Sequence, residues 1–342
     1  MQAVFFESYG GPEVLKYGPF KDPVAGPNDV LVAVKACALN HLDIWVRNGL
    51  PGVSIPMPHI PGSDVSGTVL ETGPGVKHFQ KNDRVIVSPG QIPSQSFQEF
   101  ESRDSYSPAF QILGLQTQGG YAEKVCVSER FVRSVSDKYS FEEWAAIPLA
   151  ALAAYHMLVT RAQLKAGETV LIQAGGSGVG SYALQIAKFL GARVFTTVGD
   201  PQKVERAKKL GADEVILYKN ENFAEKTKKL TDGKGVDVVF EHIGPEVWQK
   251  SIIALARGGR LVTCGATSGA KVQMELRAFF SKQLSILGSY MGSFSELLKV
   301  LELAERGHIR PVLDKVFPLK EAAEAQRYME ARKNFGKIVL TL

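Results

Sequence analysis

The stretch VLIQAGGSGVGSYALQIAK, residues 170–188, places a glycine-rich loop between an apolar run and a helix-like segment. Glycine in such a loop permits a tight turn and a close approach of the backbone to a pyrophosphate. The N-terminus of the following helix offers free N–H groups and a positive dipole to the same anion. Ser177 stands where a G-x-G-x-x-G frame that begins at Gly175 would have its middle glycine. We expect a dinucleotide-binding loop at residues 175–180; a turn that needs glycine for packing alone is the alternative.

The sequence on either side of this loop alternates apolar strands with helical segments. The strand-like runs are ETVLIQA (168–174), ARVFTTV (192–198), DEVILY (213–218), VDVVFEH (236–242) and GRLVTCG (259–265). Helical stretches such as YALQIAKFLGA and PQKVERAKKLGA lie between them. This alternation predicts an α/β fold with a parallel sheet covered on both faces. Right-handed crossovers make such a sheet doubly wound.

The N-terminal part of the chain has a different pattern. DVLVAVKA (29–36), SGTVLET (66–72), DRVIVSP (83–89) and YAEKVCVS (121–128) are short strand-like runs divided by glycine and proline turns. We expect a β-rich, barrel-like domain at 1–140, which the last apolar strand of the chain, within 310–342, completes. The dinucleotide-binding domain then occupies 141–309. The polar and aromatic stretch 91–118 is expected to form a protruding lobe.

Composition excludes several classes of protein. The net charge of +5 is dispersed, which argues against nucleic-acid binding. Cys37, Cys126 and Cys264 are far apart and odd in number, as in a protein of the reducing cytoplasm. The N-terminus has no signal-peptide pattern, and the apolar run 144–159 is short for a membrane span. We therefore expect a cytoplasmic enzyme with no membrane contact.

The end of the second strand of the doubly wound domain bears on the choice of cofactor. Val198 stands where an NAD-dependent enzyme most often carries an acidic residue for the ribose diol. Gly199 leaves room for a 2′-phosphate, and Lys203 could contact it from the next helix. Asp200 opposes this interpretation, because a carboxylate repels a phosphate. The sequence favours NADPH and leaves NADH open.

Seven segments in this order resemble the medium-chain dehydrogenase/reductase superfamily over essentially the full chain. They are NHLDIWVRNG (40–49), PGSDVSGTV (61–69), GGYAEKV (119–125), AGGSGVG (174–180), KKLGADEVI (208–216), QLSILGS (283–289) and FGKIVL (335–340). The details are most similar to the zinc-free quinone oxidoreductase, or zeta-crystallin-like, branch. SPGQIPSQSF (88–97) and FQILG (110–114) also resemble bacterial zinc-type alcohol dehydrogenases. The resemblance implies a GroES-like catalytic domain and a Rossmann domain.

The same resemblance implies that no catalytic zinc is bound. The three ligand positions of the zinc dehydrogenases match Asn40, Ser63 and a residue near Leu149, which are an amide, a hydroxyl and an apolar side chain. The lobe 91–118, which carries four cysteines around a structural zinc in those enzymes, has none. Apolar packing of Phe97, Phe100 and Phe110 is expected to fill the lobe instead. The positions of the proton relay match Leu42 and Trp45, which cannot transfer protons.

The resemblance also suggests which residues line the catalytic site. Asn40 and Asp43 match the N-x-x-D of the zinc-free reductases, and Asn40 could orient a carbonyl oxygen; capping of the next helix is the alternative role for both. Asp64 is a third candidate, or a structural residue tied to the backbone or to an arginine such as Arg47. His41 matches a contact of the cofactor pyrophosphate, although it could equally be a surface residue. Trp45 is expected to shape the substrate pocket or to pack in the core.

The expected cofactor contacts fall into three groups. The pyrophosphate and phosphate loop would involve Gly175, Gly176, Ser177, Gly178, Val179, Gly180 and Lys337. The adenosine half would involve Gly199, Lys203, Tyr218, His242 and Ile243. The nicotinamide would lie near Cys264, Gly265, Ala266, Ser289 and Tyr290. Ala153 departs from the family pattern, because many relatives have a threonine there.

Three functions remain open from the sequence. The first is zinc-independent, NADPH-dependent transfer of hydride to a quinone or an α,β-unsaturated carbonyl. The second is an alcohol dehydrogenase with an atypical or absent metal, and the third is a catalytically silent NADPH-binding scaffold. FSKQLSILGSYM (280–291) matches the edge strand through which family members dimerise, so we expect a homodimer or a tetramer.

Overall fold

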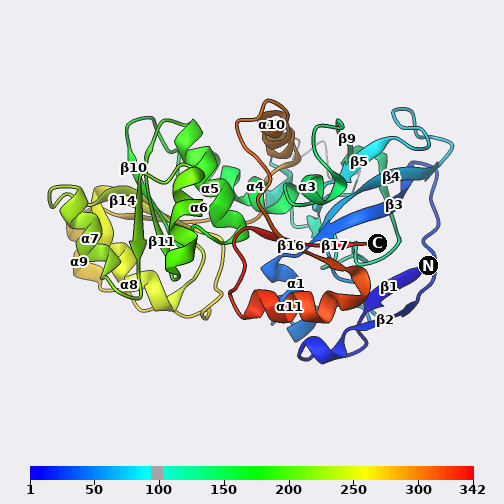
Figure 1. Cartoon of the computed structure of the whole chain (residues 1–342), viewed down its shortest axis with the longest axis horizontal. Helices are drawn as coiled ribbons and strands as arrows, with labels where there is room; N and C mark the ends of the chain where they lie inside the picture. The colour runs from blue at the N-terminus through cyan, green and yellow to red at the C-terminus, as the bar shows by residue number, and fades with distance from the viewer. Residues whose placement is uncertain (94–102) are drawn as a thin grey trace. The chain divides into compact units, whose positions relative to one another are not determined.

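The computed structural model describes residues 1–93 and 103–342, and the chain forms two compact units (Figure 1). The first unit comprises Met1–Ala150, Ser293–Glu305 and Arg310–Leu342, and the second comprises Ala151–Gly292 and Arg306–Ile309. The limits expected from the sequence, 1–140 with 310–342 and 141–309, differ from these units at two segments. Residues 141–150 and 293–305 lie in the first unit.

Both segments pack against the first unit through buried contacts. Helix α3 (Phe141–Ala145) contacts β3, β4 and β17, strands of the first unit whose bounds follow below. Helix α10 (Phe294–Glu305) begins with Phe294, whose backbone N–H donates to the buried Asp104 carboxylate at 3.1 Å. Helical periodicity predicts a helix and its apolar face, but not the strands that this face covers. The limits expected from the sequence therefore place α3 and α10 in the second unit, whereas the structure places both helices in the first unit.

In the described part of the second unit, a six-stranded parallel sheet has the order β12-β11-β10-β13-β14-β15. The chain starts in the middle of the sheet, runs to one edge and then crosses to the other side, which confirms the doubly wound α/β fold. The strands are β10 (Thr169–Ile172), β11 (Arg193–Val198), β12 (Glu214–Leu217), β13 (Val236–Glu241), β14 (Leu255–Thr263) and β15 (Ser285–Gly288). The helices are α5 (Gly178–Phe189), α6 (Val204–Lys209), α7 (Phe223–Leu230), α8 (Pro245–Ala254) and α9 (Leu276–Ser281).

The sheet of the second unit is apolar because helices cover it. Helix α5 packs on β10 and β11, and α8 packs on β13 and β14. Leu171, Phe195, Val239 and Leu261 are fully buried in one cluster with residues of α7 and α8. Strands buried on both faces read as continuous apolar runs, which is why the sequence identified them.

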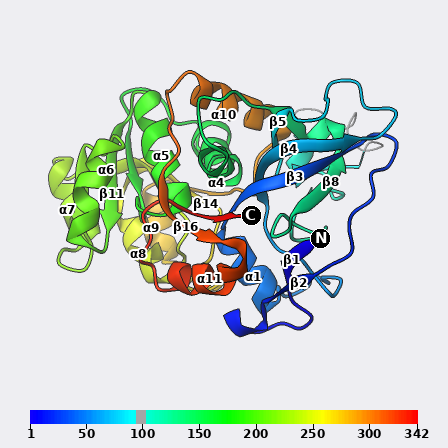
Figure 2. The same ribbon diagram turned by 45° about the vertical axis from the view of Figure 1, so that its right-hand side comes forward.

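The first unit is β-rich, as expected. In its described residues, a seven-stranded sheet has the order β16-β17-β3-β4-β5-β9, with β8 paired to β3 (Figure 2). The strands of this sheet are β3 (Asp29–Ala38), β4 (Asp64–Thr72), β5 (Arg84–Val87), β8 (Lys124–Ser128), β9 (Val132–Ser134), β16 (Leu313–Pro318) and β17 (Lys337–Thr341). Two short pairs are β1 (Gln2–Phe5) with β2 (Lys16–Pro19) and β6 (Gly90–Gln91) with β7 (Gln111–Ile112). The first unit also contains α1 (His41–Asn48) and α11 (Ala322–Glu330), and the limit between the units falls within α4 (Pro148–Tyr155).

Two of the quoted motifs, PGSDVSGTV and GGYAEKV, form one backbone junction beside β4. The N–H groups of Gly120 and Tyr121 donate to the carbonyl oxygens of Gly62 and Pro61 at 2.8 and 3.0 Å. Gly62 has a φ of +103°, and a Cβ there would lie 2.4 Å from the Tyr121 ring. Glycine is required at position 62 for both reasons, and it lets Tyr121 enter the core.

The lobe predicted at 91–118 is described only in part. Phe97 and Phe100 lie outside the described residues. Phe110 is buried, and its ring lies over Gly90, where a Cβ would come within 2.4 Å of Phe110 Cζ. Phe110 therefore packs inward, as the sequence suggested.

One helical stretch of the described chain, Phe141–Arg161, is long and apolar enough to span a membrane. It is longer than the apolar run expected from the sequence, because polar residues extend the helix at both ends. Of its most apolar window, 72% is buried inside the protein, as is usual for a core helix of a globular protein.

Candidate active site

The expected cofactor residues of the second unit lie in loops that follow the carboxyl ends of its parallel strands. Residues 175–180 follow β10, Gly199 follows β11, Tyr218 follows β12, and the remainder follow β13, β14 and β15 (His242, Ile243, Cys264, Gly265, Ala266, Ser289 and Tyr290). Lys203 ends a short 3-10 helix after Gly199. The carboxyl ends of parallel strands meet at one edge of the sheet, and the strand order reverses between β10 and β13. Dinucleotides bind at such a reversal.

The loop after β10 is held by the residues that the sequence singled out. Ser177 caps α5, because its Oγ accepts a hydrogen bond from the Gly180 N–H at 2.9 Å. A Cβ at Gly180 would lie 2.4 Å from a carbonyl oxygen, and one at Gly175 would lie 2.3 Å from Thr196 Oγ1. Packing therefore requires both glycines. The N–H groups at the first turn of α5 precede the first intrahelical hydrogen bond, so they can serve an anion as well.

His242 contacts the same loop through its imidazole ring. Its Nε2 is 3.0 Å from the carbonyl oxygen of Gln173 and 3.3 Å from Ser177 Oγ. Burial lowers the pKa of His242, so its ring is neutral at pH 7. His242 therefore supports the loop as a hydrogen-bonding group and not as a cation.

Glu241 is a site residue that sequence reasoning missed. Its Oε1 accepts hydrogen bonds from the backbone N–H groups of Ile243 and Gly244 at 2.5 and 2.7 Å. Its Oε2 accepts one from the Thr263 hydroxyl at 2.9 Å. The fully buried carboxylate thus fixes the turn that carries His242 and Ile243. The available signal was an acidic residue at the end of the apolar strand VDVVFE.

The loop after β11 brings Gly199 and Tyr218 together. A Cβ at Gly199 would lie 2.6 Å from Tyr218 Oη, so glycine leaves room for the partly exposed tyrosine. Asp200 uses its side chain locally, because its Oδ1 accepts a hydrogen bond from the Gln202 N–H at 2.9 Å. This N-cap bond directs the carboxylate to the backbone of the turn that carries Lys203.

The loops after β14 and β15 carry the residues expected at the nicotinamide. Gly265 lies against His242, since a Cβ there would be 2.7 Å from the His242 carbonyl oxygen. Burial raises the pKa of the Cys264 thiol to about 12, so it stays protonated at neutral pH. Ser289 Oγ is buried and has no hydrogen-bond partner among the described residues. That hydroxyl is therefore available to a ligand, while Tyr290 is largely exposed.

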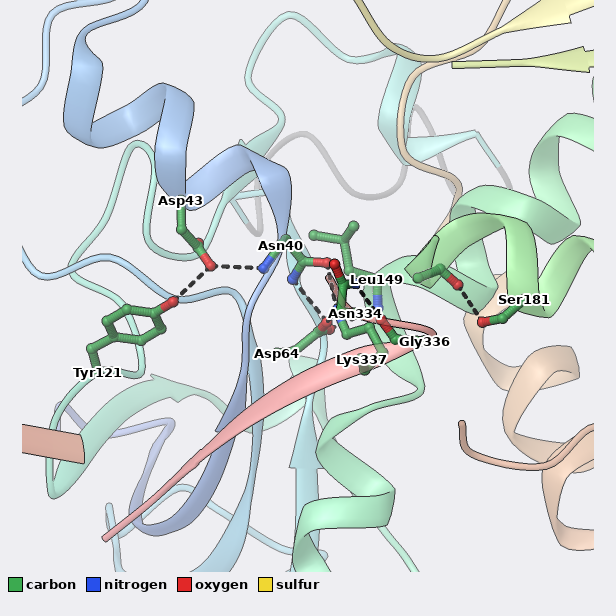
Figure 3. Close-up of polar contacts among 10 residues, drawn as sticks. Asn40, Asp43, Asp64, Tyr121, Leu149, Ser181, Asn334, Gly336 and Lys337 are labelled. Atoms are coloured by element: carbon green, nitrogen blue, oxygen red, sulfur yellow. Dashed lines mark hydrogen bonds and ion pairs between the residues drawn. The ribbon is translucent and has the colours of Figure 1, made fainter. Parts of the chain in front are cut away.

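The first unit contains a buried polar cluster at the end of β3, shown in Figure 3. Asn40 precedes α1, Asp64 begins β4 and Lys337 begins β17. Lys337 Nζ donates to Asn40 Oδ1 at 2.6 Å and to Asp64 Oδ2 at 2.9 Å, and Asn40 Nδ2 donates to the same Asp64 oxygen at 2.9 Å. Asp64 Oδ1 accepts a hydrogen bond from the Leu149 N–H at 2.7 Å. Asn40, Asp64 and Lys337 are 7%, 0% and 2% exposed.

Asp43 forms a second part of this cluster (Figure 3). Its Oδ2 accepts hydrogen bonds from the Asn40 backbone N–H at 2.8 Å and from the Tyr121 hydroxyl at 2.9 Å. Its Oδ1 is buried without a partner among the described residues. Burial raises the pKa of Asp43 to about 6 and that of Tyr121 well above its usual value. Asp43 therefore caps α1, whereas the side chain of Asn40 turns to Asp64 and Lys337. Sequence reasoning did not identify Tyr121.

Lys337 and Asp64 both make polar contacts inside this unit. Lys337, expected at the pyrophosphate, points its ammonium to Asn40 and Asp64 in the interior. Asp64 is tied to the backbone through the Leu149 N–H, one of the two contacts expected for it, and it also pairs with Lys337. Arg47, the other partner considered, forms a 2.6 Å ion pair with Glu330. Lys337 and Glu330 both belong to the C-terminal segment of the chain. Sequence spacing alone does not bring that segment next to Asp64 or Arg47.

The two expected residues on α1 lie side by side. The His41 and Trp45 rings pack edge to face, with centroids 5.1 Å apart. One helical turn separates them, so the two rings share a face of α1.

The residues of the cluster do not fit a catalytic zinc. Asn40 Oδ1 is engaged by an ammonium group, which would repel a dication, and Ser63 and Leu149 provide no strong ligand. Ser63 Oγ is buried without a partner among the described residues. No group of three or more His, Cys, Asp or Glu side chains suited to a metal ion occurs in residues 1–93 and 103–342. Lys337 already balances the charge of Asp64.

Comparison with known proteins agrees with this fold. Residues 26–137 match the alcohol dehydrogenase GroES-like domain, and residues 178–306 match the family model of the zinc-binding dehydrogenase. The chain is 33% identical to the quinone oxidoreductase of Pseudomonas aeruginosa, over 98% of both chains. It is 31% identical to the crotonyl-CoA reductase of Streptomyces collinus, over 92% of this chain and 79% of that one. A solved NAD-dependent alcohol dehydrogenase superposes with a TM-score of 0.96 at 43% identity, over the whole of both chains.

These similarities cover both units and agree with the fold. The chain is accordingly an NAD(P)H-dependent oxidoreductase, and it belongs to the medium-chain dehydrogenase/reductase superfamily, in the quinone oxidoreductase branch.

Proposed function

We propose that the protein is a zinc-independent, NADPH-dependent reductase that transfers hydride to a quinone or an α,β-unsaturated carbonyl compound. The observation that carries the proposal is the Lys337 ammonium, which is hydrogen bonded to Asn40 and Asp64 beside the positions where zinc-dependent relatives bind their metal. Similarity to a quinone oxidoreductase and to a crotonyl-CoA reductase supports this substrate class.

The chemistry suits a site without a Lewis acid. When bound, the reduced nicotinamide supplies the hydride. A quinone or an enone is already electrophilic, so the protein needs to orient it, donate a hydrogen bond to its oxygen and admit a proton from water. Asn40 can donate that hydrogen bond from its side-chain amide nitrogen. The amide does not ionise near pH 7, so this donor does not depend on a protonation state.

The preference for NADPH is supported by the loop after β11. Gly199 and Tyr218 lie in contact, Lys203 follows on the same loop, and the Asp200 carboxylate is directed to a backbone N–H. We propose that Lys203 and Tyr218 contact the 2′-phosphate. The hydrogen bond from the Gln202 N–H to Asp200 Oδ1 supports this proposal, because it offsets part of the repulsion between that carboxylate and a phosphate.

A second candidate is an alcohol dehydrogenase that uses NADH. It is favoured by the 43% identity to the solved NAD-dependent alcohol dehydrogenase. Alcohol oxidation, however, needs a group that accepts the hydroxyl proton, and Leu42 and Trp45 occupy the relay positions.

Oxidation of NADPH and NADH with a panel of quinones and enones, and reduction of NADP⁺ and NAD⁺ with primary alcohols, all with EDTA-treated protein, tests the proposal. We expect quinone or enone reduction that survives EDTA and prefers NADPH. Activity that disappears with EDTA and returns with zinc supports the alcohol dehydrogenase instead. Tight NADPH binding without turnover of any compound supports the third function, a catalytically silent NADPH-binding scaffold.

We also propose that the enzyme is a cytoplasmic homodimer. Strand β15 is at one end of the sheet order in the described part of the second unit, which leaves its outer edge for another copy of the chain. The three cysteines are free, as in a reducing compartment.

A further inference from the structure

The side-chain amide of Asn40 is held between two groups of opposite hydrogen-bonding sense. The Lys337 ammonium can only donate, and an ionised carboxylate such as that of Asp64 can only accept. The amide oxygen must therefore face Lys337, and the amide nitrogen must face Asp64, as the 2.6 and 2.9 Å distances require. A flipped amide would set its N–H against the ammonium and its oxygen against the carboxylate. Figure 3 shows the observed orientation, with the Asn40 side chain between Lys337 and Asp64.

The count of hydrogen atoms leaves one donor on Asn40. Its Nδ2 carries two hydrogens, and Asp64 Oδ2 accepts one of them. No partner in the described part of the chain accepts the other. Asn40 also keeps the largest exposed fraction of the three residues, 7% against 0% for Asp64 and 2% for Lys337. Asn40 is thus the most accessible residue of the cluster.

The ammonium also changes the strength of that donor. A hydrogen bond from Lys337 to Oδ1 draws electron density from the amide, which makes the remaining N–H a better donor. Asp64 is itself fixed at its other oxygen by the Leu149 N–H. Lys337 on β17, Asp64 on β4 and the Leu149 N–H of α4 therefore hold the amide of Asn40, the residue before α1. Together they fix the direction of its remaining N–H.

We propose that Lys337 and Asp64 are positioning residues, which form a clamp that aims the free N–H of Asn40 at the carbonyl oxygen of the substrate. This inference rests on the proposed function, since it assigns the donor that binds the oxygen as negative charge develops on it. A fixed donor of this kind stabilises the transition state more than the ground state, because no reorientation is needed during hydride transfer. It also assigns Lys337 a role different from a contact with the pyrophosphate.

The test compares Asn40→Ala with the double variant Lys337→Met/Asp64→Asn, which removes both charges and so leaves no unpaired buried ion. Lys320→Met, an exposed lysine of the same unit, is the matched control. The measurements are kcat and KM for a quinone and the Kd of NADPH by fluorescence. We expect kcat to fall about 100-fold in Asn40→Ala and in the double variant, as for loss of one oriented donor. The Kd of NADPH should change less than about threefold.

Adding Asn40→Ala to the double variant separates the clamp from independent effects. If the clamp acts only through Asn40, the triple variant loses no more than about threefold beyond the double variant. Losses that multiply would overturn the proposal. So would an unchanged kcat with a Kd for NADPH raised tenfold or more, which would place Lys337 at the cofactor.

Two further variants keep the test decisive if the double variant does not fold. Lys337→Arg retains a donor-only group and should keep kcat within about tenfold of the wild type. Lys337→Gln provides an amide that can donate or accept, so only Asp64 still fixes the orientation of the Asn40 amide, and this variant should lose more of kcat than Lys337→Arg. Equal losses in these two variants contradict the clamp.

Binding of 4-nitrophenolate to the NADP⁺ complex distinguishes failure of the clamp from failure of the proposed function. The phenolate oxygen imitates the anionic oxygen that forms during reduction and can accept the Asn40 N–H. Even if no quinone or enone is reduced, the clamp predicts that the wild type binds the phenolate. Asn40→Ala and the double variant should bind it at least about tenfold more weakly, and equal binding in all proteins overturns the clamp.

Discussion

At the scale of single residues, Asp43 connects the chemistry of the candidate site to stability. Its buried carboxyl has a pKa of about 6, above the value near 3.8 of the unfolded chain. At pH 5 the folded state therefore binds a proton that the unfolded state lacks. The contribution of Asp43 to the free energy of unfolding consequently falls as pH rises from about 4 to 6.

The variant Asp43→Asn tests this sign, because asparagine has no proton to lose. We expect the free energy of unfolding of the wild type, relative to that of the variant, to decrease by roughly 2 kcal/mol between pH 4 and pH 7. Urea denaturation at several pH values measures it. The exposed Asp137→Asn provides the control. A difference that stays constant with pH would mean that Asp43 is charged throughout.

At the scale of elements, the start of α5 combines helix capping with the expected phosphate site. Ser177→Ala removes the hydrogen bond from Gly180 N–H to Ser177 Oγ and should cost about 1 kcal/mol of stability. Because the same turn presents the N–H groups expected to bind pyrophosphate, the Kd of NADPH should also rise by about threefold or more. Unfolding curves and NADPH fluorescence measure the two effects.

Ser140→Ala is a matched control for that cap. Ser140 caps α3 in the same way, with Oγ accepting from the Glu143 N–H at 3.2 Å. It should show a similar loss of stability with an unchanged Kd for NADPH. If both variants weaken NADPH binding equally, the effect is general destabilisation and the loop after β10 has no special part in it.

At the scale of the whole molecule, the proposed dimer pairs two copies of the chain through an edge of the second unit's sheet. Gly288 lies on β15, and nothing lies within 4 Å of a Cβ placed there, so a side chain fits within one chain. Gly288→Lys should therefore fold and yet prevent another β15 from pairing with this edge. Light scattering should show a dimer for the wild type and a monomer for this variant. Asn220→Lys, just after β12 at the opposite edge, should remain dimeric.

The fold could be predicted from the sequence to a large extent, because its signals are local. Apolar runs of strand length alternate with helical segments in the second unit, and each became a strand or a helix. The limits of the units could not be predicted as well. The first residues of α3 and α10 have helical patterns like those of the other helices, and only their contacts with β3, β4, β17 and Asp104 assign them to the first unit.

The sequence could predict which residues belong to the candidate site, but not which of them are hydrogen bonded to one another. The sequence by itself determined that Asn40, Ser63 and Leu149 are an amide, a hydroxyl and an apolar side chain, and that a glycine loop precedes α5, since these depend only on which residues are present. The tertiary structure alone decided that Lys337 lies against Asn40 and Asp64, 273 residues from Asp64 along the chain. It also decided that Tyr121 reaches Asp43 past Gly62. A hydrogen bond depends on positions within about 3 Å, and only the pairing of β17 with β3 and of β3 with β4 brings such distant residues that close.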